Sequence, residues 1–123
     1  MFPYDGYLQL ARKLAGVVTN ESCMRSAVSR AYYASLHKSI KLAEDNGARF
    51  LYKVKPEIHR EVVDYFKYRG NMVFSLVGVK LGRLRKDRNK CDYDDNVKNI
   101  KKTAENAIID ADEIFKTKEI SDI

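Results

Sequence analysis

The sequence contains few of the residues that interrupt helices. Only two prolines and six glycines occur among its 123 residues, and the alternation of polar and apolar residues that is typical of strands is scarce. No internal repeat or low-complexity linker divides the chain, and hydrophobic residues make up an ordinary 45% of it. We therefore expect residues 1–123 to form one all-α domain.

Cysteines are few, and long apolar runs are absent. Cys23 and Cys91 form no CxxC motif and have no nearby histidine that would complete a zinc site, so we expect reduced thiols. No apolar run approaches the roughly 20 residues that cross a bilayer. The first residues contain no basic segment followed by an apolar core, the pattern of a secretory signal. These absences predict no membrane association and a cytoplasmic location.

The motifs of metal and cofactor chemistry are absent as well. No pair of acids and no His/Cys cluster has the spacing of metal ligands, and no glycine-rich phosphate loop or nucleophile elbow occurs. We expect neither a metal nor another cofactor. His59, which stands beside Arg60 and Glu61 in an amphipathic segment, is predicted to be an exposed surface residue.

Apolar residues at helical spacing predict five helices with short connections, which favours an antiparallel bundle. Thr19 or Asn20 is expected to cap the second helix, and Asn71 the fourth. We expect Asp92, Asp94 and Asp95 to cap the fifth helix, whose apolar stripe begins at Val97. The expected segments are Tyr4–Val18, Ser22–Asn46, Pro56 to Gly70, Met72–Lys90 and a last helix that reaches Phe115.

The segment Ser22–Asn46 is predicted to be the central helix, because no proline or glycine interrupts it. At 100° per residue it has a wide apolar stripe and an opposite polar face. Arg30, Tyr33 and His37 share that polar face. The stripe consists of Met24, Val28, Ala31, Tyr32, Leu36, Ile40 and Ala43.

Arg88 is the most informative charge in the sequence. It follows Val77, Leu81 and Leu84 at helical spacing, so it projects from an otherwise apolar face. A guanidinium in that position needs a carboxylate, a carbonyl or a phosphate as its partner. Two interpretations stay open: a structural arginine paired with an acid such as Asp92, or an arginine that binds phosphate.

Two blocks of the sequence resemble a known family. Residues 25–37, RSAVSRAYYASLH, resemble the second-helix signature of HEPN domains, and residues 84–93, LRKDRNKCDY, resemble a later segment of the same family. HEPN domains are small all-α proteins of prokaryotic defence and toxin–antitoxin systems. The resemblance implies a four-helix up-and-down core with an additional helix, commonly as a homodimer.

The resemblance also implies a chemistry. HEPN ribonucleases carry an arginine, usually a polar residue after it, and a histidine four to six residues after the arginine, and they cleave RNA without a metal at a dimer interface. Arg88 and Asn89 match the start of this motif, but Tyr93 stands where the histidine would be. A phenol, whose unperturbed pKa is about 10, is a poor base at neutral pH. We therefore expect weak or no general ribonuclease activity.

Arg30 and His37 also lie on one helix face, seven residues and about 10 Å apart. They either form a structural contact with Tyr33 or belong to a composite catalytic site beside Arg88 and Tyr93. The net charge of +6 is compatible with nucleic acid. The basic run that follows Lys80 is either a solvated helix face or an RNA-tracking surface, with these residues as the candidate RNA contacts: Arg83, Arg85, Lys86 and Lys90.

Two functions follow as hypotheses. The first is a HEPN-type protein of RNA processing or defence, such as a metal-independent toxin endoribonuclease. The second is a non-catalytic HEPN module that dimerises and binds RNA or a partner protein. For the partner, the resemblance implies a nucleotidyltransferase-like antitoxin.

Overall fold

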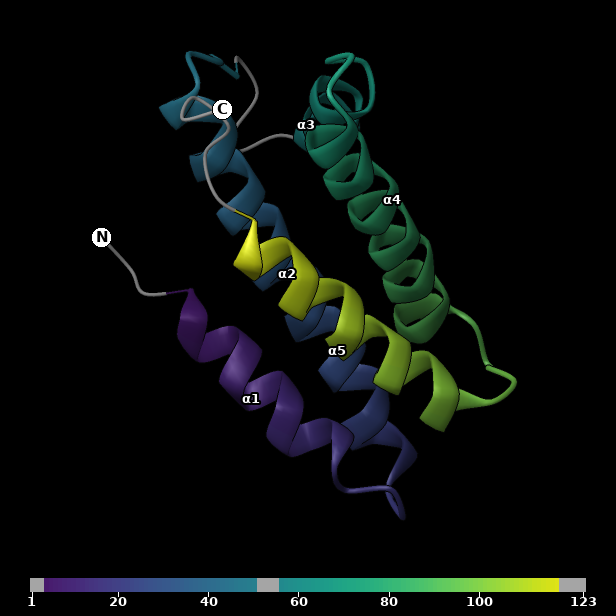
Figure 1. The fold of residues 1–123 in the computed structure, drawn as a ribbon. Helices are drawn as coiled ribbons and strands as arrows, with labels where there is room; N and C mark the ends of the chain where they lie inside the picture. The colour runs from purple at the N-terminus through teal and green to yellow at the C-terminus, as the bar shows by residue number, and fades with distance from the viewer. Residues whose placement is uncertain (1–3, 51–55, 118–123) are drawn as a thin grey trace.

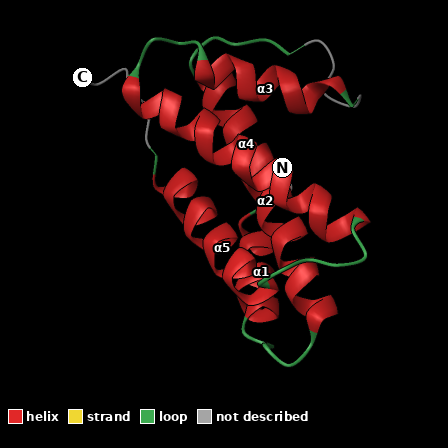
Figure 2. Cartoon of the chain, turned by 90° about the vertical axis from the view of Figure 1, so that its right-hand side faces the viewer, coloured by secondary structure: helices red, strands yellow, loops and turns green. Residues whose placement is uncertain are grey.

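A computed structural model describes residues 4–50 and 56–117, and within these ranges the chain forms five α-helices and no strand (Figures 1 and 2). The helices are α1 (Asp5–Ala15), α2 (Glu21–Asp45), α3 (Glu57–Lys67), α4 (Met72–Tyr93) and α5 (Ile100–Lys116). The expected all-α bundle is confirmed. No helix in the described ranges is long and apolar enough to cross a membrane.

Helix α2 is the centre of the bundle, because it alone contacts each of the other four described helices. Helices α1 and α4 flank the pair α2 and α5 from opposite sides (Figure 1) and do not contact each other. Helix α3 packs on α4 and α2 only, so it is the additional helix of a four-helix core. The side chain of Asn20 accepts a hydrogen bond from the Cys23 amide at 3.1 Å and caps α2, as expected.

The predicted apolar stripe of α2 is buried, except for Ile40, which is half-buried. Small residues on other faces of α2 are buried as well, among them Ala27, Ala34, Ser35 and Ser39. They allow the neighbouring helices to approach α2 from several directions. A helix that is enclosed in this way positions its few large polar side chains firmly.

Helix α3 runs antiparallel to α4 at close range. A Cβ atom on Gly78 of α4 would lie 2.8 Å from the backbone nitrogen of Lys67, whereas one on Gly82 would lie 3.8 Å from Val63. Residues nearer the start of α3 therefore lie beside residues nearer the end of α4. This register brings His59, one turn before Val63, level with the last two turns of α4.

The ends of α4 and α5 differ from the prediction. The Asn71 side chain caps α4 as expected, but α4 continues to Tyr93, so Asp92 lies inside this helix. The Arg25 side chain explains the next segment, since it donates hydrogen bonds to the backbone carbonyls of Asp94 and Asp95 at 2.6 and 3.0 Å. Because Arg25 of α2 binds these two carbonyls, they do not accept the first backbone hydrogen bonds of a new helix.

Helix α5 therefore begins at Ile100, after Asn99 in the left-handed region with φ 54°. The expectation that the aspartates cap this helix, and that Val97 belongs to it, is wrong. Helix α1 likewise ends at Ala15 and not at Val18.

Candidate functional site

A pocket of about 540 Å³ lies between α2, the start of α3 and the last turns of α4. We call it the arginine–histidine pocket. Its apolar wall consists of Leu36, Ile40, Pro56 and Ile58, and its polar and aromatic lining consists of Tyr33, His37, His59, Arg85, Arg88, Asn89 and Tyr93. Three helices contribute to one concave surface, and no carboxylate occurs among its described lining residues.

Arg88 is held at this pocket from three sides. Its Nε atom lies 2.8 Å from Asp92 Oδ2, one turn further along α4. The N–H does not point at that oxygen, so the contact is an ion pair without a hydrogen bond. The guanidinium carbon also lies 5.2 and 5.8 Å from the ring centres of Tyr33 and Tyr93, within the range of cation–π contacts. The structure therefore leaves both interpretations of Arg88 open. It pairs with Asp92, as a structural arginine would, and it lines the pocket, as a phosphate-binding arginine would.

His59 lies in the same pocket, so the prediction that it is an exposed surface residue is wrong. Its imidazole is half-buried, and its Nδ1 atom contacts the hydroxyl of Tyr32, a fully buried residue of α2. Burial raises the pKa of the Tyr32 phenol, which therefore keeps its proton. The phenol has this nitrogen as its one hydrogen-bond partner among the described side chains.

The Tyr32 contact determines which nitrogen of His59 carries the proton. A buried hydroxyl that did not donate would leave its proton unsatisfied. We therefore assign the Tyr32 hydroxyl as donor to Nδ1, which puts the proton of the neutral imidazole on Nε2. With Nδ1 turned toward the core, His59 can offer an N–H donor to a group in the pocket without becoming charged.

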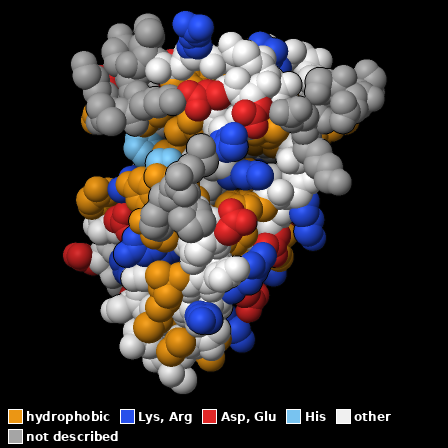
Figure 3. All heavy atoms as spheres, turned by 90° about the vertical axis from the view of Figure 1, so that its left-hand side faces the viewer, with side chains coloured by type: hydrophobic (Ala, Val, Ile, Leu, Met, Phe, Trp, Pro, Cys, Tyr) orange, Lys and Arg blue, Asp and Glu red, His pale blue; other side chains and the backbone are white. Residues whose placement is uncertain are grey.

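His37 enters the pocket from α2. Its ring stacks on Tyr4 with centroids 3.8 Å apart and planes 10° apart, and neither nitrogen makes a hydrogen bond to a described residue. Figure 3 shows histidine atoms at the surface of one face, beside hydrophobic side chains. Among the described residues, therefore, neither nitrogen of His37 has a hydrogen-bond partner.

The electrostatics of the pocket favour an anion. Burial lowers the pKa of His37, and burial together with the charges of Arg85 and Arg88 lowers the pKa of His59. Both imidazoles are therefore neutral at pH 7. Arg85 makes no ion pair or hydrogen bond with any described residue, so no carboxylate of the described ranges compensates its positive charge.

The other predicted residues are dispersed. Arg83 does not face the pocket, because its guanidinium binds both carboxylate oxygens of the buried Asp110 on α5, at 2.9 and 2.7 Å. Lys86 and Lys90 are exposed on α4 and line none of the pocket. Of the four candidate RNA contacts, Arg85 alone lines it.

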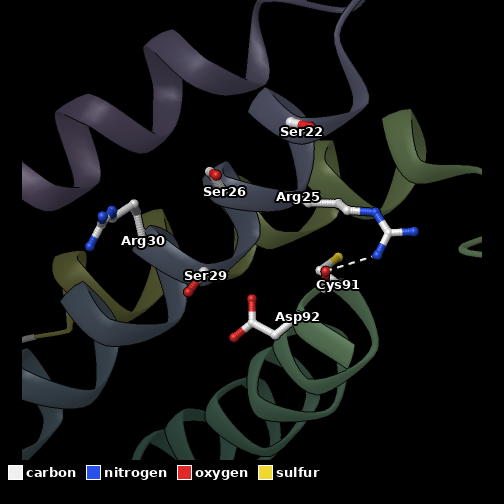
Figure 4. Close-up of a pocket in the computed structure, with 7 residues that line it drawn as sticks. All are labelled: Ser22, Arg25, Ser26, Ser29, Arg30, Cys91 and Asp92. Carbon is white, nitrogen blue, oxygen red and sulfur yellow. Dashed lines mark hydrogen bonds between the residues drawn. The ribbon is translucent and has the colours of Figure 1, made fainter. Parts of the chain in front are cut away.

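Arg30 lines a different hollow, of about 340 Å³, whose lining includes Asp92, the ion-pair partner of Arg88 (Figure 4). Its guanidinium carbon lies 5.6 Å from the ring centre of Tyr7 on α1. The suggested composite site is thus brought together in part: His37 lies with Arg88, Asn89 and Tyr93, and Arg30 does not.

One feature of the sequence indicates that His59 is partly buried. The buried residues of α3 are Ile58, Val62 and Phe66, which follow one another at helical spacing. Val63 is partly buried as well, and it lies one turn after His59. Including Val63 widens the buried face of α3 far enough to reach the histidine.

Among the described residues, no group of three or more His, Cys, Asp or Glu side chains could hold a metal ion. No protein-family model matches the chain, and searches of curated proteins and of solved structures find no match either. The geometry of the arginine–histidine pocket is therefore the evidence on function.

Proposed function

We propose that the protein is a metal-independent endoribonuclease of the HEPN type that cleaves single-stranded RNA in the arginine–histidine pocket. One observation carries the proposal: His37, His59 and Arg88, from three different helices, line one pocket without a described carboxylate. The motif at Arg88 lacks a histidine along the chain, and two imidazoles reach the same pocket from α2 and α3. The resemblance of residues 25–37 and 84–93 to HEPN domains supports the same reading.

Arg88 and Arg85 suit the binding of the scissile phosphate. A guanidinium presents paired N–H donors that match phosphate oxygens and stabilise the charge that develops on them. The Nε2–H of His59, set by Tyr32, can donate a further hydrogen bond to the same group. Of these donors, Arg88 is held by Asp92, Tyr33 and Tyr93 and His59 by Tyr32 before the substrate arrives, as electrostatic catalysis requires.

His37 suits the role of the base. It is neutral at pH 7 because burial lowers its pKa, and it can accept the proton of the ribose 2′-hydroxyl as that oxygen bonds to phosphorus. The bond from phosphorus to the 5′-oxygen breaks, and this oxygen takes a proton, for which the Tyr93 hydroxyl at the pocket rim is the candidate donor. The products are a 2′,3′-cyclic phosphate and a 5′-hydroxyl; the phenol then regains a proton and the imidazolium loses one.

A second candidate function is a non-catalytic module that binds RNA or a partner protein. The specific observation in its favour is the Arg88–Asp92 ion pair, which already neutralises the arginine. This candidate requires that the pocket binds an anion without cleaving RNA. The two candidates share the pocket, and only the first forms a product.

Incubation of a fluorescent RNA oligonucleotide with the purified protein and excess chelator tests the proposal. We expect cleavage, with 2′,3′-cyclic phosphate ends, that falls at least a hundredfold in His37→Ala and in Arg88→Ala and less steeply in Tyr93→Phe. Arg60→Ala is the matched control, because Arg60 is an exposed residue of α3 that pairs with Asp64 outside the pocket. Binding without cleavage would favour the second candidate, and cleavage that persists in Arg88→Ala would refute the site.

A further inference from the structure

The second hollow, which Arg30 lines, has no part in the chemistry proposed above. It lies between the first turns of α2 and the end of α4 and is lined by hydroxyl and charged side chains (Figure 4). We call it the serine notch. Ser22, Ser26 and Ser29 follow one another along α2, and Asp92 of α4 approaches from the opposite side.

The charges around the serine notch are not equally available. Arg25 is fully used, since it donates to the backbone carbonyls of Cys91, Asp94 and Asp95 and pairs with Glu21 at 2.9 Å. Its guanidinium points away from Arg30 (Figure 4). Arg30 makes no ion pair or hydrogen bond with any described residue, so its charge is the free one.

Asp92 belongs to the wall between the two hollows. It lines the serine notch, whereas its ion-pair partner Arg88 lines the arginine–histidine pocket. Its Oδ2 atom contacts Arg88 Nε at 2.8 Å, and its Oδ1 atom accepts no hydrogen bond from a described residue, so Oδ1 can accept one from a ligand. This ion pair therefore has its arginine in the pocket and its aspartate in the notch.

The donor set of the notch matches a ribose phosphate. Hydroxyls and a carboxylate are the partners of sugar hydroxyls, and a free guanidinium is the partner of a phosphate. Inorganic anions alone fit less well, because Asp92 repels them. The 2′-hydroxyl of RNA is both donor and acceptor and can be read by such groups.

From this arrangement we propose that the serine notch binds the ribose and phosphate of the nucleotide next to the scissile one, with Arg30 on the phosphate and Ser29 and Asp92 on the 2′-hydroxyl. This inference rests on the proposed function. It assigns Arg30 to binding along the strand and not to the reacting phosphate.

Two probes of different length separate the notch from the pocket. Uridine 3′-monophosphate fills the pocket alone, and hexauridylate reaches both hollows; all binding is measured in the His37→Ala background, so that the RNA stays uncut. We expect Arg30→Ala to weaken hexauridylate binding about tenfold, the effect of one charge-assisted hydrogen bond, and to reduce the slope of log affinity against log salt by about 0.7. Its affinity for the monophosphate stays unchanged. Lys41→Ala, which removes an exposed charge of α2 that pairs with Asp45 outside both hollows, is the matched control.

A third probe tests the sugar contact. The His37→Ala protein is expected to bind hexauridylate more tightly than hexadeoxyuridylate, and the addition of Ser29→Ala narrows that difference. Equal weakening of both uridine probes by Arg30→Ala, or no weakening of either, overturns the inference. Failure of the proposed function gives a different result, since the RNA then stays uncut in the cleavage assay whatever Arg30→Ala does to the binding of hexauridylate.

Discussion

Arg83 and Arg88 lie five residues apart on α4, and each pairs with an aspartate, but the two pairs have opposite uses. Arg83 reaches across to α5 and binds both oxygens of Asp110, whose side chain is 6% exposed while that of Arg83 is 53% exposed. Arg88 pairs within its own helix, and its side chain is 17% exposed. The more exposed arginine is committed to the fold, and the more buried one faces a pocket.

The difference follows from what each pair joins. The Arg83 pair joins α4 to α5. Breaking it leaves the buried carboxylate of Asp110 without a partner, which lowers the free energy of unfolding. Breaking the Arg88 pair separates two side chains of one helix, one turn apart, and leaves no fully buried carboxylate behind, because the Asp92 side chain is 28% exposed. The proposed function requires Arg88 to exchange Asp92 for a phosphate, and this exchange breaks no ion pair between helices.

The largest effect is expected for Arg88→Ala on catalysis. Loss of the guanidinium raises the barrier by about 3 kcal/mol, a rate loss of at least a hundredfold, with little change in the unfolding midpoint. Initial rates of RNA cleavage and urea unfolding of the same preparation measure both. A large loss of stability in this variant would show that Arg88 belongs to the fold like Arg83.

Arg83→Ala is expected to show the reverse pattern. It strands the carboxylate of Asp110, which costs several kcal/mol in a fully buried pair, and the exposure of Arg83 reduces that cost to about 2 kcal/mol through solvent screening. Urea unfolding at pH 7 measures it, with Arg60→Ala as the exposed-pair control. Cleavage by the folded fraction should stay near the wild-type rate; unfolding at the wild-type midpoint would contradict the structural role.

The two arginines also differ in their effect on His59. Arg88 is among the charges that lower the pKa of this histidine, and Arg83 is not. Because the folded pKa is depressed, the folded state binds fewer protons than the unfolded chain below about pH 6.5. The free energy of unfolding therefore decreases as pH falls through 6.5 toward the folded pKa.

Arg88→Ala should raise the pKa of His59 and flatten this acid dependence, whereas Arg83→Ala should leave the pKa unchanged. Titration of the histidine NMR signals and urea unfolding between pH 5 and 8, the range in which histidine titrates, measure the two effects. A His59 pKa that responds equally to both substitutions would contradict the separation of the two regions.

The smallest effect is expected for Asp92→Asn. Removal of the carboxylate charge frees Arg88 from a contact worth about 0.3 kcal/mol, so uridine 3′-monophosphate should bind about twofold more tightly. Isothermal titration measures the change, and Asp64→Asn on α3 is the control for a same-helix pair outside the pocket. Weaker binding in Asp92→Asn would show that the carboxylate orients Arg88 instead of competing for it.

The sequence predicts the helices well and the site in part. Periodicity identifies α2, its buried stripe and the caps Asn20 and Asn71, because these depend on neighbours along the chain. The start of α5 was missed, since Arg25, 69 residues before Asp94, holds the carbonyls of that segment. Contacts of this kind leave no local pattern.

The site shows the same limit. The sequence places Arg88, Asn89 and Tyr93 together because they lie on one helix, and the structure shows that they line one pocket with His37. His59 was missed because its place depends on the antiparallel register of α3 on α4, which the close approach at Gly78 sets. The basic run likewise does not predict that Arg83 and Arg88 have different partners, since the partner of Arg83 is Asp110 on another helix.

The central claim is that both histidines and Arg88 belong to one anion-binding pocket. The chain contains only two histidines, so imidazole labelling gives two NMR signals, which can be followed as uridine 3′-monophosphate is added. We expect both signals to shift with one dissociation constant and the His59 pKa to rise on binding, because the phosphate charge stabilises the imidazolium. Both shifts should persist in Arg83→Ala and vanish in Arg88→Ala. Signals that stay still in wild type, or that move equally in Arg88→Ala, would contradict the account.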